Sequence, residues 1–289
     1  MISLRYDRQL RIQGWNQERI SKLRVGIIGG DYGAFYTALP LVSMGVGEQG
    51  EIRLLVSKMK RARLIDHRIN LGSDLVGFLL KVNPLMKKSI RHYKVDIINQ
   101  HLTLFLRNLD IIIDTTNNPT TKAILVSYAI KRGVKYISIA TAPCYGRMNM
   151  IWKDGFTESD LPLNFFMPEF QDIPQEEIVS MLLGGLVSSV FSNYAAGKPQ
   201  ENDDIVYNLL DANRLTPPNI DNYQTFLLKY KNRDPQYYDF SGYRVIMIGA
   251  GALGNPVAIA LSKIRIGELI IIDPDKVEET NLNRQYCYY

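Results

Sequence analysis

The sequence predicts an α/β protein with a doubly wound, mostly parallel sheet, made of one complete unit and the first β-α-β of a second. Two observations support this class. A strand, glycine turn and helix occur in the same order twice, as RVGIIGGDYGA at residues 24–34 and as RVIMIGAGALG at residues 244–254. Elsewhere, continuous apolar runs typical of buried parallel strands alternate with helical patterns.

The elements follow one another in β-α-β order. After the glycine turn and helix of each copy comes a second apolar strand, EIRLLV at 51–56 or LIIID at 269–273. Further strands are predicted at 111–114 and 136–139, and helices at 75–81, 121–132 and 184–196. Gly133 is placed to end the second of these helices, because glycine adopts the left-handed conformation that helix C-termini favour.

Length and composition bound the number of domains. With 289 residues and 46% apolar content, the chain should form about two domains, each with a sizeable core. A proline pair at 217–218 and a polar run after it predict a linker or insert over 213–241. The domains are then 1–212 and 242–289. Because the second is roughly a quarter as long as the first, we expect an incomplete copy with an open apolar edge at 269–273.

Composition disfavours several classes of protein. No stretch approaches the about 20 apolar residues of a membrane span, and the start, MISLRYDRQLRIQGW, is charged where a secretory signal is apolar. We therefore expect a cytoplasmic protein without a membrane span. Two cysteines, three histidines and no Cys-x-x-Cys predict no protein-built metal site. The net charge of +5 and the basic cluster at 58–63 indicate a solvated surface rather than a nucleic-acid site.

The second glycine turn has the spacing of a phosphate-binding loop in a Rossmann-like sheet. Gly249, Gly251 and Gly254 form G-x-G-x-x-G between a strand and a helix. In such loops the first glycine permits a tight turn, the second lets phosphate approach the backbone, and the third lets helix and strand pack closely. Asp273 ends the next strand, where an acidic side chain typically binds a ribose hydroxyl. An adenine nucleotide is implied, and a nicotinamide-dependent dehydrogenase would share these features.

A more specific motif follows. Asp273-Pro-Asp275 and the run Asn-Leu-Asn-Arg-Gln at 281–285, together with the glycine loop, resemble the ThiF/MoeB/ubiquitin-activating-enzyme superfamily. The resemblance implies adenylation of the C-terminal glycine of a ubiquitin-like β-grasp protein, with ATP and Mg²⁺. It also implies that Asp273 binds the ribose, that Asp275 belongs to the nucleotide site, and that Asn281, Arg284 and Gln285 reach the phosphates. Arg284 would be a catalytic residue that stabilises negative charge as pyrophosphate leaves.

The first copy carries substitutions at the equivalent positions. Asp31 aligns with Gly251 and would fill, and negatively charge, the space that phosphate needs. Val56 and Lys58 stand where the second copy has its two aspartates. The superfamily's D-x-T-D-N run supplies an aspartate to the metal-nucleotide complex, but Asn117 replaces that aspartate here and is a poorer magnesium ligand. The resemblance therefore implies that residues 1–212 are an inactive adenylation domain, of the kind that pairs with an active one.

The N-terminal Arg5-Tyr-Asp-Arg8-Gln9 resembles a superfamily motif in which an arginine crosses a dimer interface to the partner's ATP. Carried over, Arg8 is the preferred catalytic arginine and Arg5 the runner-up, because Arg8 stands in the Arg-Gln pair of that motif. Spacing leaves both open, since residues i and i+3 share a helix face. Further matches to the superfamily lie at 72–77, 82–84 and 205–212.

Several superfamily features are absent from the second copy: the downstream lysine, the D-x-T-D-N strand and the acceptor cysteine. Cys144 and Cys287 are expected to be packed small residues. We therefore expect two partners, a β-grasp protein and either a separately encoded C-terminal adenylation half or a homologous subunit. The alternatives are a truncated product, a non-catalytic scaffold and, less favoured, an NAD-dependent oxidoreductase. Conjugation, thiolation and sulfur-carrier activation all stay open as pathways.

Overall fold

The computed structural model describes residues 4–56, 71–93, 102–142, 145–161, 177–208, 213–215, 240–264, 266–285 and 287–288. Within these ranges the chain forms an eight-stranded sheet and a separate two-stranded sheet. The two correspond to the two copies of the repeat. The predicted α/β class, with one complete unit and the first β-α-β of another, is confirmed.

The first sheet has the strand order β3-β2-β1-β4-β5-β6-β7-β8. Its strands are β1 Arg24–Gly29, β2 Glu51–Val56, β3 Ile90–Tyr93, β4 Ile111–Asp114, β5 Lys135–Ala142, β6 Tyr145–Ile151, β7 Asp203–Asn208 and β8 Asn213–Leu215. The strands from β3 to β5 are parallel, and β6, β7 and β8 are added antiparallel. The chain reverses its direction of winding at β1, which pairs with β2 on one edge and β4 on the other. β8 lies in the range predicted as a linker and joins the sheet.

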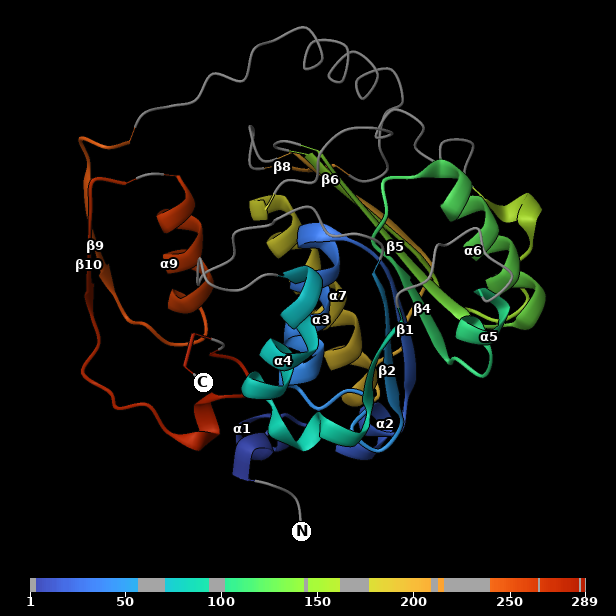
Figure 1. Cartoon of the computed structure of the whole chain (residues 1–289), viewed down its shortest axis with the longest axis horizontal. Helices are drawn as coiled ribbons and strands as arrows, with labels where there is room; N and C mark the ends of the chain where they lie inside the picture. Colours follow the sequence, from blue (N-terminus) through green and yellow to red (C-terminus); the bar gives the residue numbers. More distant parts are fainter. Residues whose placement is uncertain are drawn as a thin grey trace, which may run out of the picture.

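Helices cover both faces of this sheet (Figure 1). One face packs against α3 Asp31–Ser43, α4 Leu71–Val82 and α7 Glu177–Ala195, and the other against α5 Leu102–Leu106 and α6 Pro119–Arg132. Short elements complete the unit: η1 Leu4–Tyr6, α1 Asp7–Leu10, α2 Gln17–Ser21, η2 Pro84–Lys88 and η3 Glu158–Asp160. α6 begins at the cap Asn118, which accepts from Thr121 N at 2.9 Å, and ends at Gly133 with φ of +63°, as predicted.

The helix α7 is both long and apolar. Its 19 residues reach a mean hydropathy of 1.5, so by length and composition it could cross a membrane. The expectation that no stretch is apolar enough is therefore wrong for this helix. Val179, Leu183 and Val187 are fully buried in the core of the first unit. Core helices of α/β folds can be this apolar because both neighbouring layers bury them.

The second unit consists of β9 Arg244–Ile248, α9 Gly254–Lys263, β10 Glu268–Ile272 and η5 Glu279–Asn281. β9 and β10 are parallel, and α9 lies between them and the first unit (Figure 1). The opposite face of the strand pair is open, with Ile246, Ile248 and Ile272 exposed by 60%, 83% and 51%. In the first unit, by contrast, β1 is buried at every residue after Arg24. Among the described residues, no layer covers this face of the second unit as helices cover it in the first.

Candidate nucleotide-binding site

The three glycines of the second turn meet the geometric demands of a phosphate-binding loop. Gly249 has φ of +95°, a conformation that side-chain-bearing residues rarely adopt. A Cβ on Gly254 would collide with the carbonyl oxygen of Gly249, so only glycine lets α9 approach the turn this closely. At Gly251 the space is open, and a Cβ would meet only Gln285 Nε2, at 3.6 Å. The loop backbone at Gly251 is therefore accessible to a ligand.

Asp273 holds the loop from the end of β10. Its carboxylate accepts from Ala250 N at 2.5 Å and from Asp275 N at 2.8 Å. These two backbone hydrogen bonds lower the pKa of Asp273 below its ordinary value of 3.8, so the group is ionised at neutral pH. The side chain is exposed. An ionised acceptor beside the glycine loop is what a ribose hydroxyl would need.

A pocket of about 260 Å³ opens against this loop. It is lined by Arg8, Ala250, Gly251, Asp273, Asp275, Lys276, Val277, Glu278, Asn281, Gln285 and Tyr288. Its volume is slightly below the ~300–1,000 Å³ of typical ligand sites. Arg8 and Lys276 provide cations for phosphate and Asp273 an acceptor for a hydroxyl, so the lining fits a nucleotide. In the described part of the chain, no group of three His, Cys, Asp or Glu side chains could hold a metal ion.

Most of the predicted site residues come together at this pocket. Gly249 and Gly254 determine the conformation of the loop but do not line the pocket. Arg284 also lies outside the lining, because its Nη1 donates to Thr280 O at 2.7 Å and to Asn283 Oδ1 at 2.9 Å. Burial and the charge of nearby Arg8 lower the pKa of Arg284. The two predicted catalytic arginines thus lie close enough for the charge of one to affect the other.

The two N-terminal arginines differ in their burial and in their contacts. Arg5 is buried, and its Nη2 donates to Leu282 O at 2.6 Å, so it anchors the first unit to the second. Arg8 is exposed and lines the pocket of its own chain, although the resemblance implied a contact across a dimer interface. Figure 1 shows α1 beside the C-terminal segment that carries the arginine motif.

Some residues of the site were not singled out from the sequence. Lys276 lies inside the D-x-D-x motif and could have been noticed there. Asn255 could not be recognised from the sequence. Its Nδ2 donates to Ala250 O at 2.6 Å and its Oδ1 accepts from Cys287 N at 3.0 Å.

Cys287 is half-buried rather than buried, and burial raises the pKa of its thiol. Cys144 lies outside the described residues.

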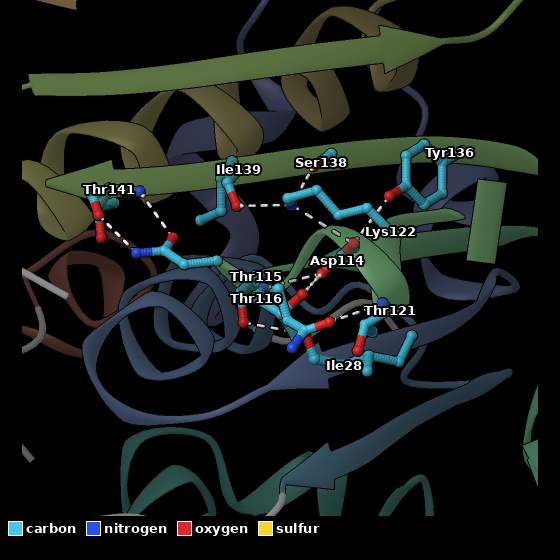
Figure 2. Close-up of polar contacts among 12 residues, drawn as sticks. Ile28, Asp114, Thr115, Thr116, Thr121, Lys122, Tyr136, Ser138, Ile139 and Thr141 are labelled. Atoms are coloured by element: carbon cyan, nitrogen blue, oxygen red, sulfur yellow. Dashed lines mark hydrogen bonds and ion pairs between the residues drawn. The ribbon is translucent and has the colours of Figure 1, made fainter. Parts of the chain in front are cut away.

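In the first unit, side chains of the protein fill the carboxyl end of β4, the strand beside β1 (Figure 2). Asp114 is fully buried, and its Oδ2 accepts from Tyr136 Oη at 2.8 Å and from Lys122 Nζ at 3.4 Å. Lys122 Nζ also donates to Ser138 Oγ at 2.6 Å. Burial lowers the pKa of Lys122 and raises that of Tyr136. The polar groups that end β4 therefore satisfy one another without a ligand.

The side-chain amide of Asn117 also forms hydrogen bonds within the protein. Its Nδ2 donates to Thr141 O at 2.6 Å and its Oδ1 accepts from Thr141 N at 3.0 Å. Val56 is buried at the end of β2. Lys58 lies outside the described residues, as does the side chain of Asp31. A metal ion would have to compete with Thr141 N for the Oδ1 of Asn117, which fits the predicted loss of nucleotide binding.

Comparison with known proteins points to one family. Residues 227–289 match the ThiF family. A segment of 45 residues is 48% identical to the SAMP-activating enzyme E1 of Haloferax volcanii, and covers 16% of this chain and 17% of that protein. Another 45-residue match is 50% identical to the adenylyltransferase and sulfurtransferase UBA4 of Candida albicans, and covers 16% of this chain and 10% of that protein. The matched segments thus span less than a fifth of the curated relatives' length.

Solved structures show the same fold over a longer stretch. Crystal structures of PaaA and of E. coli MccB with ATP each cover 69% of this chain, with TM-scores of 0.53 and 0.55. Sequence identity is 18% and 14%, and the aligned parts cover 73% and 64% of those chains.

Proposed function

Residues 227–289 of this chain belong to the ThiF family, and from this premise we propose that the chain is a component of an enzyme that activates a ubiquitin-like protein. The reaction is ATP-dependent adenylation of the C-terminal glycine of a β-grasp protein. One observation carries the proposal: a single pocket gathers the second glycine loop, Asp273 and Arg8. The relatives named as adenylyltransferases support the same reaction.

The chemistry demands positive charge at one end of this pocket. A carboxylate oxygen of the substrate forms a bond to the α-phosphorus, the bond to the bridging oxygen breaks, and pyrophosphate leaves with that electron pair. Mg²⁺ bound with ATP would neutralise part of the phosphate charge. Arg8 and Lys276 line the pocket, Arg284 lies near Arg8, and fixed guanidinium groups stabilise charge that develops on phosphate oxygens. Asp273 would bind the ribose, with Asp275, Asn281 and Gln285 completing the nucleotide contacts.

Pyrophosphate exchange with a β-grasp substrate tests the reaction. Arg8→Ala and Arg284→Ala should each lower the exchange rate about 100-fold, because each removes a charge that acts on the transition state. Arg11→Ala is the matched control. Arg11 belongs to the same N-terminal segment but lies outside the pocket lining, exposed and paired with Asp7 at 2.6 Å. Equal rates for all three variants would contradict the assignment.

Asp273→Asn tests the nucleotide contact separately. The amide keeps one acceptor oxygen for the two backbone N–H groups that the carboxylate now binds, so the dissociation constant for ATP should rise about tenfold. Asp160→Asn is the control, since Asp160 also accepts from a backbone N–H, that of Thr157 at 2.8 Å, and is not part of the pocket. Titration calorimetry on both variants distinguishes a contact to the ligand from a local loss of stability.

The open side of the second unit supports the proposed second partner. β1 pairs with β4 along one edge, whereas the equivalent edge of β9 carries no strand in the described part of the chain. Ile28 packs with α5 and α6, whereas the equivalent Ile248 is 83% exposed. A C-terminal adenylation half, encoded separately or as part of a homologous subunit, would cover this edge and face. Its addition should raise the exchange rate and protect Ile248 from solvent.

A non-catalytic scaffold is the second candidate. It is favoured by the bonds of Arg284 to Thr280 O and Asn283 Oδ1, which occupy the guanidinium in the protein itself. A scaffold would bind a β-grasp protein equally well with Arg284→Ala, whereas an adenylating enzyme would lose exchange. Either role is compatible with the expected cytoplasmic location, which stays a prediction.

A further inference from the structure

Buried hydrogen bonds between the two units link Arg284 to Gln9, the residue that follows Arg8. Asn283 Nδ2 donates to Gln9 Oε1 at 3.0 Å, and Asn283 Oδ1 accepts from Arg284 Nη1 at 2.9 Å. Gln9 directly follows Arg8, which lines the pocket. The amide of Asn283 therefore contacts one arginine directly and the backbone neighbour of the other.

Gln9 is fixed in turn by the first unit. Its Nε2 donates to Gln17 Oε1 at 2.6 Å and to Met44 O at 3.0 Å. Gln17 donates to the same Met44 O at 2.9 Å and accepts from Trp15 Nε1 at 3.0 Å. Gln9, Gln17 and Asn283 are buried, with 6%, 8% and 5% exposure. The Nε2 group of Gln9 donates both of its hydrogens to the first unit, so the orientation of this buried amide is fixed. Its Oε1 therefore faces Asn283 as an acceptor.

This arrangement addresses an electrostatic problem in the site. Arg8 and Arg284 carry like charges and lie close enough for Arg8 to lower the pKa of Arg284. Repulsion would drive the two side chains apart unless other contacts held them. Thr280 O and Asn283 Oδ1 hold Arg284, and the bonds of Gln9 hold the backbone next to Arg8.

We propose that Gln9 and Asn283 are positioning residues of the nucleotide site, and that their hydrogen bond holds Arg284 near Arg8, which lines the pocket, before the ligand arrives. The inference rests on the proposed function, because the arginines need positioning only if they bind phosphate. Preorganised charges stabilise a ligand or a transition state without first having to reorganise. Neither residue needs to touch the nucleotide.

A double-mutant cycle on the full chain tests the proposal, with the dissociation constant for ATP measured by titration calorimetry. Gln9→Ala and Asn283→Ala should each raise this constant about tenfold, and the double variant should raise it by clearly less than the product of the two single effects, because the hydrogen bond between them is lost only once.

Lys263→Ala is the matched control. Lys263 also joins the two units, through an ion pair of 3.3 Å with Glu177, but lies outside the pocket lining. It should lower the stability to urea and leave the dissociation constant within about twofold. Additive effects of Gln9→Ala and Asn283→Ala, or an equal loss of affinity in Lys263→Ala, overturn the positioning role alone. A wild-type chain that binds no ATP overturns the proposed function, and the positioning role with it.

Discussion

The ammonium group of Lys263 lies 3.3 Å from the carboxylate of Glu177, and this ion pair joins α9 of the second unit to α7 of the first. The Glu177 side chain is 8% exposed and that of Lys263 is 21% exposed. Tyr36 Oη donates to the same carboxylate at 2.6 Å. Glu177 is therefore a shared acceptor at which two helices of the first unit, α3 and α7, and one helix of the second meet.

Loss of the Lys263 ammonium should destabilise the protein more than loss of an exposed partner at the same distance. Lys263→Ala leaves the Glu177 carboxylate largely buried without its counter-ion, which should cost about 1–2 kcal/mol of the free energy of unfolding in urea. Lys153→Ala removes an ion pair with Glu201 that is also 3.3 Å long, but whose side chains are 57% and 75% exposed. It should cost less than about 0.5 kcal/mol. Equal losses would show that the Glu177 pair is solvated.

The hydrogen bond of Tyr36 predicts a loss of stability at alkaline pH. Burial and the charge of Glu177 raise the pKa of Tyr36 well above its ordinary value of 10.0, so the folded protein keeps the phenol neutral. The unfolded chain ionises near pH 10, so the stability from Tyr36 is fully present below that pH and is lost as the pH rises further.

Urea denaturation at pH 8 and pH 11 measures this effect. Tyr36→Phe should show a smaller decrease between the two pH values than the wild type, because it cannot ionise in either state. Tyr243→Phe removes an exposed phenol and keeps the ring contact with Phe240, so its decrease should match the wild type. If Tyr36→Phe loses as much stability between pH 8 and pH 11 as the wild type does, the explanation is wrong.

Two adjacent glycines of α7 provide a test of its packing on α3. A Cβ at Gly184 would collide with the backbone carbonyl of Tyr36, whereas a Cβ at Gly185 meets nothing within 4 Å. Gly184→Ala should therefore lower the free energy of unfolding by about 1–3 kcal/mol. Gly185→Ala should raise it by about 0.5–1 kcal/mol, because alanine favours the helix. Chemical denaturation of both variants checks the sign of each change, and the same sign for both would contradict the packing.

The sequence predicted the parallel core of the fold because that part depends on local patterns. The runs at 51–56 and 111–114 are rich in apolar residues, and they form β2 and β4 at those bounds. β6 was not predicted, because it alternates large apolar side chains with Arg147 and Asn149, which are buried. A buried arginine gives no hydrophobic signal, so its strand cannot be recognised from periodicity.

The site was predictable where a motif is contiguous and unpredictable where distant segments meet. The glycine loop and Asp273 could be identified from spacing, but Gln9 and Asn283 are 274 positions apart and nothing local relates them. The spacing of Arg5 and Arg8 could not decide between them for another reason. The comparison assumed one helix, whereas Arg5 lies in η1 and Arg8 in α1, so the two side chains do not share a face.

The pair formed by Asn117 and Thr141 opposes the use of position 117 as a metal ligand. At the end of β5, the amide of Asn117 donates to the carbonyl of Thr141 and accepts from the N–H of the same residue. An aspartate at position 117 could still accept from Thr141 N, but its second oxygen would face Thr141 O and repel it. Asn117→Asp would therefore lose one of these two hydrogen bonds before it provided a metal ligand, and a chain that gained the ligand would first become less stable.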